Sequence, residues 1–282
     1  MSNMLVIGGS GFVGSHLIAE LKRRGHDVWN YDIAEGQDIL DKKMLREQFA
    51  RTKPKEVYHL AGSVVMIPAE EDPREDLLLN CMGTLNVIEL CKEYEAKLLF
   101  TGTGASYGIG ATPHRENSLP MSVCNYGISK FAAENYIRKE VWVNGLKGVI
   151  VRFSSVYGDG RGRGPVNIFT RQAREQGFMT VYGPGNQTRD IVHYSDAIRG
   201  MLLAMQSGEY GEIYNVGSGK ETSVVEIAWM IHELTGAEVK HVDHEESLYD
   251  LPRSWFDISK LQALGYEPLV DLKGGIKELL GQ

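Results

Sequence analysis

The sequence has few cysteines and no long apolar stretch. Its three cysteines, Cys81, Cys91 and Cys124, cannot all pair with one another, and their spacing matches no metal-binding motif. We therefore expect reduced thiols in a cytoplasmic protein. No apolar run approaches the ~20 residues that span a bilayer, so no membrane-spanning helix is expected. The first residues lack the basic leader, the longer apolar segment and the cleavage site of a signal peptide.

An excess of positive charge is also lacking. Lysine and arginine total 30 against 37 aspartates and glutamates, which gives a formal net charge of −7. Because nucleic-acid binding requires a basic surface, we expect no nucleic-acid partner, although a few local arginines could hold one small phosphorylated ligand. His232, His241 and His244 fall on a helix followed by a strand and form no compact ligand set, so no metal site is expected.

The bulk composition is that of an ordinary enzyme, and the first half of the chain has a clear pattern. Hydrophobic residues make up 43% and charged residues 24% of 282 positions, as is typical of a soluble globular protein with one large or two small domains. Short β-rich apolar runs alternate with helical patterns, which predicts an α/β fold with a doubly wound parallel sheet, a Rossmann domain. We predict strands at 4–7, 28–32, 56–61, 98–101 and 149–153, and helices at 14–24, 44–51, 76–94 and 126–143.

The pattern changes after Tyr157. Residues 158–165 are rich in glycine, which predicts a loop over a ligand or a hinge between domains. We predict one domain at 1–157 with about 189–217, and a smaller C-terminal α/β domain at 158–188 and 218–282. Within the later part we expect helices at 167–176, 195–206, 224–234 and 272–280, and strands at 180–182 and 213–216.

A glycine-rich turn follows the first predicted strand. Gly9, Gly11 and Gly14 match G-x-G-x-x-G, and Gly8, Gly11 and Gly14 match G-x-x-G-x-x-G. Glycines at these positions allow a tight turn, a close approach of the backbone to a diphosphate, and close packing of helix on strand. With a strand before it and a helix after it, the motif predicts a dinucleotide site.

Asp32 ends the second predicted strand, 18 residues beyond Gly14. A carboxylate at this point accepts hydrogen bonds from the ribose 2′-hydroxyl and repels a 2′-phosphate, which favours NAD over NADP. No arginine follows immediately to bind a phosphate. Asp38 and Ile39 are weaker candidates for contact with the adenine.

A tyrosine and a lysine four residues apart provide acid/base chemistry. Tyr126 and Lys130 share one face of a predicted helix, so the ammonium is expected to lower the pKa of the phenol. A tyrosine shifted toward neutrality can act as a general acid or base. Thr103 follows another predicted strand and can offer a hydroxyl to the same oxygen. A bare Y-x-x-x-K spacing carries little information, and its position after the glycine turn gives it weight.

Together these features resemble the extended short-chain dehydrogenase/reductases, and within them the nucleotide-sugar epimerase/dehydratase family. The resemblance extends from Gly8 almost to the C-terminus. Its landmarks are Gly8, Gly11 and Gly14, Asp32, residues 59–62 (HLAG), residues 80–86 (NCMGTLN), Thr103 with Tyr107 and Gly108, Tyr126 and Lys130, residues 152–158 (RFSSVYG), 187–193 (QTRDIVH), 214–217 (YNVG) and 257–260 (DISK).

The resemblance implies roles for the matching residues. Tyr126 would be the catalytic base, Lys130 would hold the nicotinamide ribose, and Thr103 would orient a sugar hydroxyl. The domain at 1–157 would bind NAD, and the smaller one would bind a nucleotide-diphosphate sugar. The helices near 76–94 and 126–143 would form a four-helix bundle in a homodimer, although they would pack equally well on their own sheet. The implied NAD-binding residues are Gly8, Gly11, Phe12, Val13, Gly14, Asp32, Asp38, Ile39, Leu60, Ala61, Gly62, Asn80, Tyr126, Lys130 and Phe153.

Departures from the family pattern narrow the reaction. Family members that dehydrate have an acidic residue just after the Thr103 position, and those that epimerise at C3 and C5 have a cysteine there, whereas this chain has Gly104 and Ala105. One base, one hydroxyl and one nicotinamide suffice for 4-epimerisation of a sugar such as UDP-glucose, UDP-galactose or an N-acetyl form. They also suffice for reduction of a 4-keto sugar by NAD(P)H. A third possibility is a regulatory protein that binds NAD without catalysis.

The implied substrate residues rest on fewer matches. Arg189 would meet the diphosphate, and Asn167 would bind the nucleotide. The family often has Asn where Ser155 stands, and another diphosphate arginine where this chain reads HEESL at 244–248. Arg253 could substitute for that arginine, or it could pair with a nearby acid. Ser155, Asn167, Arg189 and Arg253, with Thr103, are therefore the candidate substrate residues.

Overall fold

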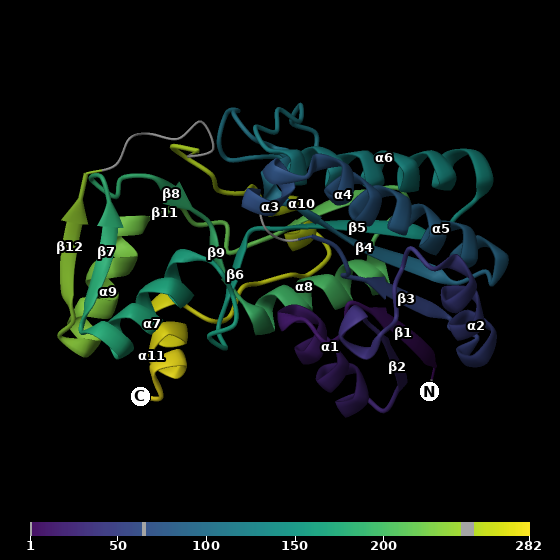
Figure 1. Ribbon diagram of the computed structural model, residues 1–282, viewed down its shortest axis with the longest axis horizontal. Coiled ribbons are helices and arrows are strands. Elements are labelled where there is room, and N and C mark those ends of the chain that lie inside the picture. The colour runs from purple at the N-terminus through teal and green to yellow at the C-terminus, as the bar shows by residue number, and fades with distance from the viewer. Residues whose placement is uncertain (1, 64–65, 244–250) are drawn as a thin grey trace. The chain divides into compact units, whose positions relative to one another are not determined.

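The computed structural model describes residues 2–63, 66–243 and 251–282. Its main sheet has six strands in the order β10-β5-β4-β3-β1-β2, and β1 pairs in parallel with both β2 and β3. The predicted α/β fold with a parallel central sheet is confirmed (Figure 1). The strands of this sheet are β1 (Asn3–Ile7), β2 (Asp27–Tyr31), β3 (Glu56–His59), β4 (Lys97–Thr103), β5 (Gly148–Phe153) and β10 (Ile213–Val216).

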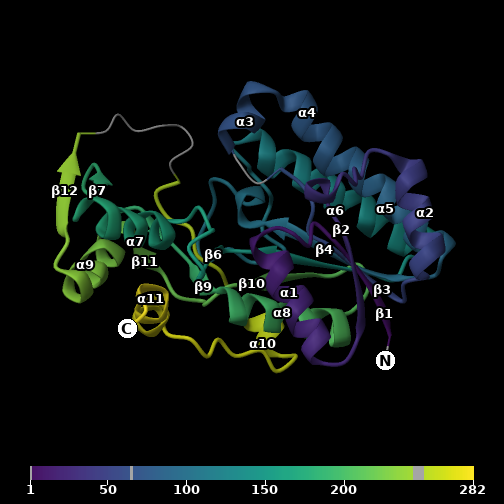
Figure 2. The same cartoon turned by 60° about the horizontal axis from the view of Figure 1, so that its bottom comes forward.

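Helices cover both faces of this sheet. Figures 1 and 2 show α1 (Phe12–Arg23) on one face, and α2 (Lys42–Thr52), α5 (Gly83–Glu93) and α6 (Asn125–Asn144) on the other. Apart from the edge strand β2, the strands are largely buried on both sides, which explains their continuous apolar runs. Their carboxyl ends lead into the glycine turn, the loop after His59 and Thr103, so the candidate residues gather at one edge of the sheet.

The single helix predicted at 76–94 begins earlier and is interrupted. A short helix, α3 (Met66–Glu71), precedes α4 (Pro73–Leu77), and the Asp72 side chain caps α4 by accepting from the amides of Arg74 and Glu75. A π-helical turn (Leu78–Met82) then joins α4 to α5. Hydrophobic spacing reveals neither the cap nor the extra residue of a π turn, and such turns often occur at functional sites.

The later part of the chain forms small sheets packed with helices. Its core contains Phe169, Val181, Ile227, Ile231 and Ile276. Two strand pairs are parallel: β6 (Ser155–Tyr157) with β9 (Ile191–His193), and β7 (Phe178–Tyr182) with β12 (Glu238–Val242). A third pair, β8 (Thr188–Arg189) with β11 (Thr222–Ser223), is antiparallel. The helices are α7 (Pro165–Gln176), α8 (Tyr194–Ser207), α9 (Val224–Thr235), α10 (Ser259–Gln262) and α11 (Leu272–Leu280).

The chain divides into two compact units. The first comprises residues 1–108, 119–152 and 201–214, and the second 109–118, 153–200 and 215–282. These limits differ from the predicted domains mainly at 109–118, 153–157 and 189–200, which all belong to the second unit. In that unit the amide of His114 donates to the Trp255 carbonyl, and 153–157 and 189–200 stay together because β6 pairs with β9. No helix in the described ranges combines the length and apolarity needed to cross a membrane.

Candidate active site

The glycine turn between β1 and α1 has positions that only glycine fits and one that stays open. Gly8 has a φ of +88°, and a Cβ there would lie 2.5 Å from the Ala61 amide nitrogen. A Cβ on Gly14 would lie 2.3 Å from the Gly8 carbonyl oxygen. A Cβ on Gly11 would meet only that same oxygen, at 3.4 Å. Gly8 and Gly14 are thus required by packing, whereas Gly11 leaves room for a ligand.

The N-terminus of α1 has the features of an anion-binding site. Gly11 is its N-cap residue, so no side chain caps the helix, and its first turn contains no acidic residue. Phe12 and Val13 are the first two residues of the helix. Amides at this end carry the positive end of the helix dipole, so the turn fits a diphosphate.

Asp32 lies at the end of β2, beside the same turn. Its carboxylate accepts hydrogen bonds from the amides of Ser10 and Ala34, each at 2.9 Å. No described lysine or arginine forms an ion pair with Asp32, and Glu35 adds a second negative charge nearby, where it accepts from Asn30. This environment fits an unphosphorylated ribose better than a 2′-phosphate.

Four other predicted coenzyme residues have mainly structural contacts. Asp38 accepts a hydrogen bond from the Leu40 amide, and Ile39 is buried in the core against Gly83. The amides of Leu60 and Ala61 both donate to the Ile7 carbonyl, so this loop lies directly against the glycine turn. Leu60 and Ala61 therefore border the site through their backbone, whereas the side chain of Ile39 faces the interior.

Tyr126 and Thr103 come together as predicted. Thr103 ends β4, its side-chain oxygen accepts from the Ala105 amide, and its hydroxyl hydrogen-bonds the Tyr126 phenol. Burial around the half-buried Tyr126 raises the pKa of its phenol to about 12, and the Thr103 hydrogen bond opposes that rise. The expected shift of this pKa toward neutrality is therefore wrong for the protein alone. Desolvation is the largest cause of the rise, and Cys124, Asp76 and Glu134 raise the pKa further.

Lys130 lies on α6 one turn after Tyr126 and is 3% exposed. Its ammonium is 4.1 Å from the centre of the Phe100 ring, and no described residue accepts a hydrogen bond from it. Burial lowers the pKa of Lys130 to about 8, against the opposing effect of Glu134 and Asp76. A buried ammonium with unused donors fits a ribose that brings hydroxyl oxygens.

Asn80 and Gly62 lie beside this ammonium. A Cβ on Gly62 would lie 2.4 Å from Asn80 Oδ1 and 3.5 Å from Lys130 Nζ. The Asn80 side chain is already engaged, because Oδ1 accepts from the Ser63 amide and Nδ2 donates to Asp76 and to Ser129. Besides its predicted contact with the coenzyme, Asn80 therefore links the loop after β3 to Asp76 and Ser129.

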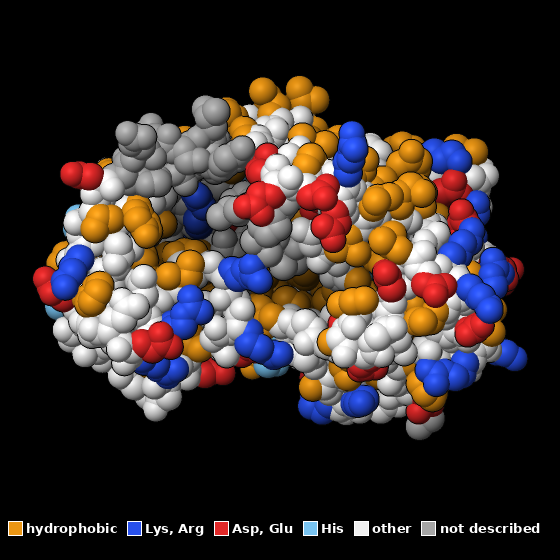
Figure 3. Space-filling model, in the orientation of Figure 1, with side chains coloured by type: hydrophobic (Ala, Val, Ile, Leu, Met, Phe, Trp, Pro, Cys, Tyr) orange, Lys and Arg blue, Asp and Glu red, His pale blue; other side chains and the backbone are white. Residues whose placement is uncertain are grey.

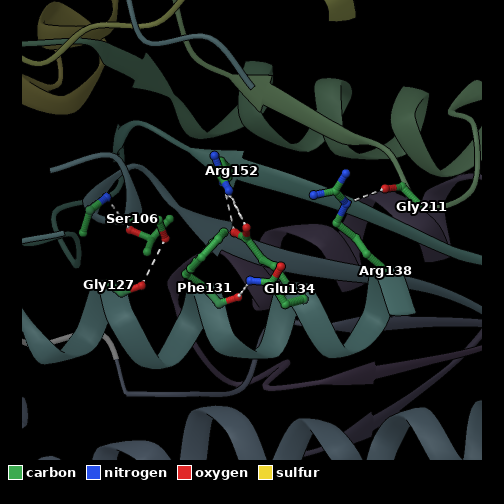
Figure 4. A network of polar contacts seen from close by, with 10 residues as sticks. Ser106, Gly127, Phe131, Glu134, Arg138, Arg152 and Gly211 are labelled. Atoms are coloured by element: carbon green, nitrogen blue, oxygen red, sulfur yellow. Dashed lines mark hydrogen bonds and ion pairs between the residues drawn. The ribbon is translucent and has the colours of Figure 1, made fainter. Parts of the chain in front are cut away.

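The sequence interpretation did not identify two buried acids at this site, Asp76 and Glu134. Figure 4 shows Glu134 on α6 with its carboxylate against the Arg152 guanidinium. The distance from Arg152 Nη2 to Glu134 Oε2 is 2.6 Å. Glu134 follows Lys130 by four residues, and Asp76 precedes Asn80 by four. That helical spacing would have placed each acid on the face of its functional neighbour.

The candidate substrate residues of the second unit are all described. The Ser155 amide donates to the Asp190 carbonyl. Phe153, which was predicted to bind the coenzyme, ends β5. Asn167 is completely buried at the start of α7, and neither polar atom of its amide has a hydrogen-bond partner among the described residues. A buried amide without protein partners suits a ligand that both donates and accepts hydrogen bonds. This lack of partners in the folded structure, and no feature of the sequence, distinguishes Asn167 from an ordinary helix residue.

The two candidate arginines have protein partners. Arg189 Nη1 donates to the carbonyls of Thr188 and Leu251, at 2.7 and 2.8 Å. Arg253 forms a two-point ion pair with Glu221, which is the alternative left open by the sequence. The HEESL stretch at 244–248 lies outside the described residues. All three cysteines are free, and the described part of the chain contains no cluster of metal-ligating side chains.

Comparisons with known proteins agree with this geometry. The NAD dependent epimerase/dehydratase family matches residues 4–217. A putative UDP-glucose 4-epimerase of Methanocaldococcus jannaschii is 33% identical over 98% of this chain and 97% of its own length. A UDP-N-acetyl-alpha-D-glucosaminuronate decarboxylase of Bacillus cytotoxicus is 31% identical over 98% and 96%.

A solved structure is similar over the same extent. The UDP-glucose 4-epimerase of Thermotoga maritima, determined with UDP-glucose, has a TM-score of 0.93 and 30% sequence identity. The match covers 99% of this chain and 97% of that one. The similarity therefore includes both compact units and is not limited to the glycine turn.

Proposed function

Since the chain belongs to the NAD dependent epimerase/dehydratase family, we propose that it is a nucleotide-sugar 4-epimerase that uses NAD. Its substrates would be UDP-glucose and UDP-galactose or their N-acetyl forms. The observation that carries this proposal is the Thr103–Tyr126–Lys130 group, with Gly104 and Ala105 beside it. This group offers one proton-transfer residue and no second acid or base next to Thr103.

The residues divide the chemistry among them. A bound NAD would supply the redox chemistry: hydride acceptance from C4 of the sugar and return of that hydride to the opposite face, with no net change in the coenzyme. In its deprotonated form, Tyr126 would accept the proton of the 4-hydroxyl and later give it back. Thr103 donates to the phenol oxygen and stabilises its deprotonated form. Lys130 holds the coenzyme ribose and contributes positive charge beside the phenol.

The coenzyme would be held by the first unit and the sugar nucleotide by the second. Gly11 and the start of α1 would bind the diphosphate of NAD, and Asp32 its adenosine ribose. Asn167 is the best-supported substrate residue because its buried amide lacks protein partners. Arg189 and Arg253 would have to exchange their present partners for a diphosphate.

A decarboxylase of nucleotide-sugar acids is the second candidate, favoured by the relative from Bacillus cytotoxicus. Oxidation at C4 of such a sugar would release CO₂ and leave an enolate that must gain a proton at C5. Gly104 and Ala105 offer no proton donor beside Thr103. A 4-keto reductase, which would consume NAD(P)H in each cycle, and a non-catalytic NAD-binding protein are the remaining alternatives.

We also propose a homodimer formed through α4, α5 and α6. Leu77, Leu78 and Met82, on α4 and the π-helical turn, and Ile128 on α6 are exposed. Figure 3 shows hydrophobic side chains gathered over these helices. An exposed apolar surface on adjacent helices supports helix packing between two copies. Light scattering of the wild type and of Leu78→Glu tests it: a dimer is expected for the first and a monomer for the second.

The central experiment uses the purified protein. Its coenzyme is released by denaturation and identified, and the protein is then incubated with UDP-glucose, UDP-galactose and their N-acetyl forms. We expect NAD and interconversion of 4-epimers without net reduction of the coenzyme. Release of CO₂ from a UDP-sugar acid would favour the decarboxylase, and stoichiometric oxidation of NAD(P)H the reductase. Bound NAD without turnover on any of these sugars would favour the non-catalytic alternative.

A further inference from the structure

A buried carboxylate lies behind the proposed catalytic pair. Asp76 on α4 is 4% exposed. Its Oδ2 accepts from the Ser129 hydroxyl at 2.5 Å, and its Oδ1 accepts from Asn80 Nδ2 at 3.0 Å. Ser129 Oγ also lies 3.1 Å from the carbonyl oxygen of Tyr126. Asp76 is therefore joined, through one hydroxyl, to the backbone of the proposed catalytic tyrosine.

The π-helical turn makes this connection between separate elements. Asp76 lies on α4 just before the turn, and Asn80 lies within the turn, four residues later. Asn80 Oδ1 accepts from the Ser63 amide in the loop after β3. Asp76 thus ties together α4, that loop and α6. The π-helical turn contributes Asn80 to the proposed active site, the loop after β3 contributes Gly62, and α6 contributes Lys130.

Among the described carboxylates near Lys130, Asp76 is the only one that is not paired with another cation. On α6, Glu134 faces Lys130 but is already paired with Arg152, at 2.6 Å. On β3, burial and the nearby Lys130 lower the pKa of His59 to about 3, so this imidazole stays neutral. The Tyr126 phenol is also neutral, because its pKa lies near 12. The Asp76 carboxylate has only the neutral partners Asn80 and Ser129. Asn80 in turn lies beside Lys130, because Asn80 Oδ1 and Lys130 Nζ both border the Cβ position of Gly62.

We propose that Asp76 is a positioning residue for the catalytic pair, and that its buried negative charge keeps the Lys130 ammonium protonated. The hydrogen bond from Ser129 holds α6, which carries Tyr126 and Lys130, beside α4. The negative charge of Asp76 offsets the positive charge of the Lys130 ammonium, which has no described acceptor. The effect of Asp76 on the reaction rate rests on the proposed epimerase function, whereas its effect on the charge of Lys130 is independent of that function.

The test is Asp76→Asn, which removes the charge and keeps the shape. The introduced amide can still accept from Asn80, and Ser129 can turn its hydroxyl to the Tyr126 carbonyl while it accepts from the new NH₂. The fold is therefore expected to survive, as circular dichroism will check. NMR of the protein labelled with [13Cε]lysine follows each ammonium with pH, and the signal lost in Lys130→Met identifies Lys130.

The wild-type Lys130 is expected to titrate with a pKa of about 8. In Asp76→Asn this pKa should fall by about one pH unit, because a nearby anion favours the charged form. Glu75→Gln is the matched control: it removes the same charge from an exposed position on α4 and should leave the titration unchanged. An Asp76→Asn protein whose Lys130 titrates as in the wild type would overturn the proposal.

Two further measurements separate this inference from the function. In the wild type, the 13Cγ shift of Asp76 at neutral pH must be that of a carboxylate; a neutral acid would overturn the proposal even if Asp76→Asn does not fold. If the wild type epimerises sugars, the alkaline limb of its kcat profile should move to lower pH in Asp76→Asn, and Asp76→Glu should restore it. An inactive wild type with the expected lysine titration would refute only the proposed reaction.

Discussion

The Arg152 guanidinium lies 2.6 Å from the Glu134 carboxylate inside the first unit, and both side chains are almost completely removed from solvent. Arg152 comes from β5, and its charge also lies over the Tyr107 ring at 4.5 Å. Glu134 is one helical turn beyond Lys130 on α6. The ion pair therefore joins the helix of the proposed catalytic residues to the central sheet without adding net charge.

Removal of one partner should be costly for the fold. Glu134→Gln leaves the buried Arg152 without its counter-ion, so we expect a loss of about 3–5 kcal/mol in the free energy of unfolding, measured with urea. The control is Glu89→Gln, which breaks the exposed ion pair with Lys42 and should cost about 0–1 kcal/mol. Equal losses in the two variants would contradict a structural role for the buried pair.

The phenol of Tyr126 should be needed for turnover and not for coenzyme binding. Tyr126→Phe removes the proton-transfer group, so we expect kcat to fall by about 10²–10⁴-fold. The affinity for NAD, measured by calorimetry, should stay close to that of the wild type, because the fold and the glycine turn are unchanged. Tyr210→Phe, an exposed tyrosine, is the control. Loss of NAD binding in Tyr126→Phe would count against the assigned role.

Gly11 offers a way to disturb the coenzyme site without disturbing the fold. Its φ of −69° suits alanine, and a Cβ there would meet only the Gly8 carbonyl oxygen. We expect Gly11→Ala to change the stability by less than about 1 kcal/mol, since no core packing is altered. NAD affinity should fall by at least about tenfold, since a methyl group would block close approach of a diphosphate. Gly110→Ala, where a Cβ has no close contact, should bind NAD normally.

The sequence predicted the central fold well because its signals are local. Apolar runs of four to seven residues became the buried strands of the sheet, and the glycine turn lies between β1 and α1 as expected. The short pairs β8–β11 and β6–β9 were missed, because two or three residues carry no periodicity and depend on partners far along the chain. The π-helical turn after α4 escaped for a similar reason.

The candidate site was predicted in its parts and not in its electrostatics. Thr103 and Tyr126 meet, and Lys130 is buried on the same helix. The direction of the Tyr126 pKa was wrong, because spacing shows which charges are near and says nothing about desolvation. The buried acid Asp76 and the pairing of Arg253 with Glu221 also required the folded structure.

Asp32 should decide between the two nicotinamide coenzymes. Asp32→Ala removes a charged acceptor worth about 1.5–3 kcal/mol, so we expect NAD affinity to fall roughly tenfold to a hundredfold. It also removes repulsion of a 2′-phosphate, so the preference for NAD over NADP, measured by calorimetry with both, should shrink. The variant loses the cap on Ala34 as well, at a cost of about 1 kcal/mol in stability. Asp27→Asn, exposed at the start of β2, is the control; an unchanged coenzyme preference in Asp32→Ala would refute the assignment.

Coenzyme affinity should weaken at alkaline pH. Burial lowers the pKa of Lys130 to about 8, so its side chain is an ammonium below that pH and a neutral amine above it. Loss of the positive charge weakens a hydrogen bond to a ribose hydroxyl by about 1 kcal/mol or more. NAD affinity measured by calorimetry should therefore be constant well below pH 8 and decline as the pH rises through about 8. Lys130→Met should bind NAD weakly with no such decline, because it has no group to titrate there. A wild-type affinity that stays flat through this range would mean that Lys130 does not hold the coenzyme as a charged donor.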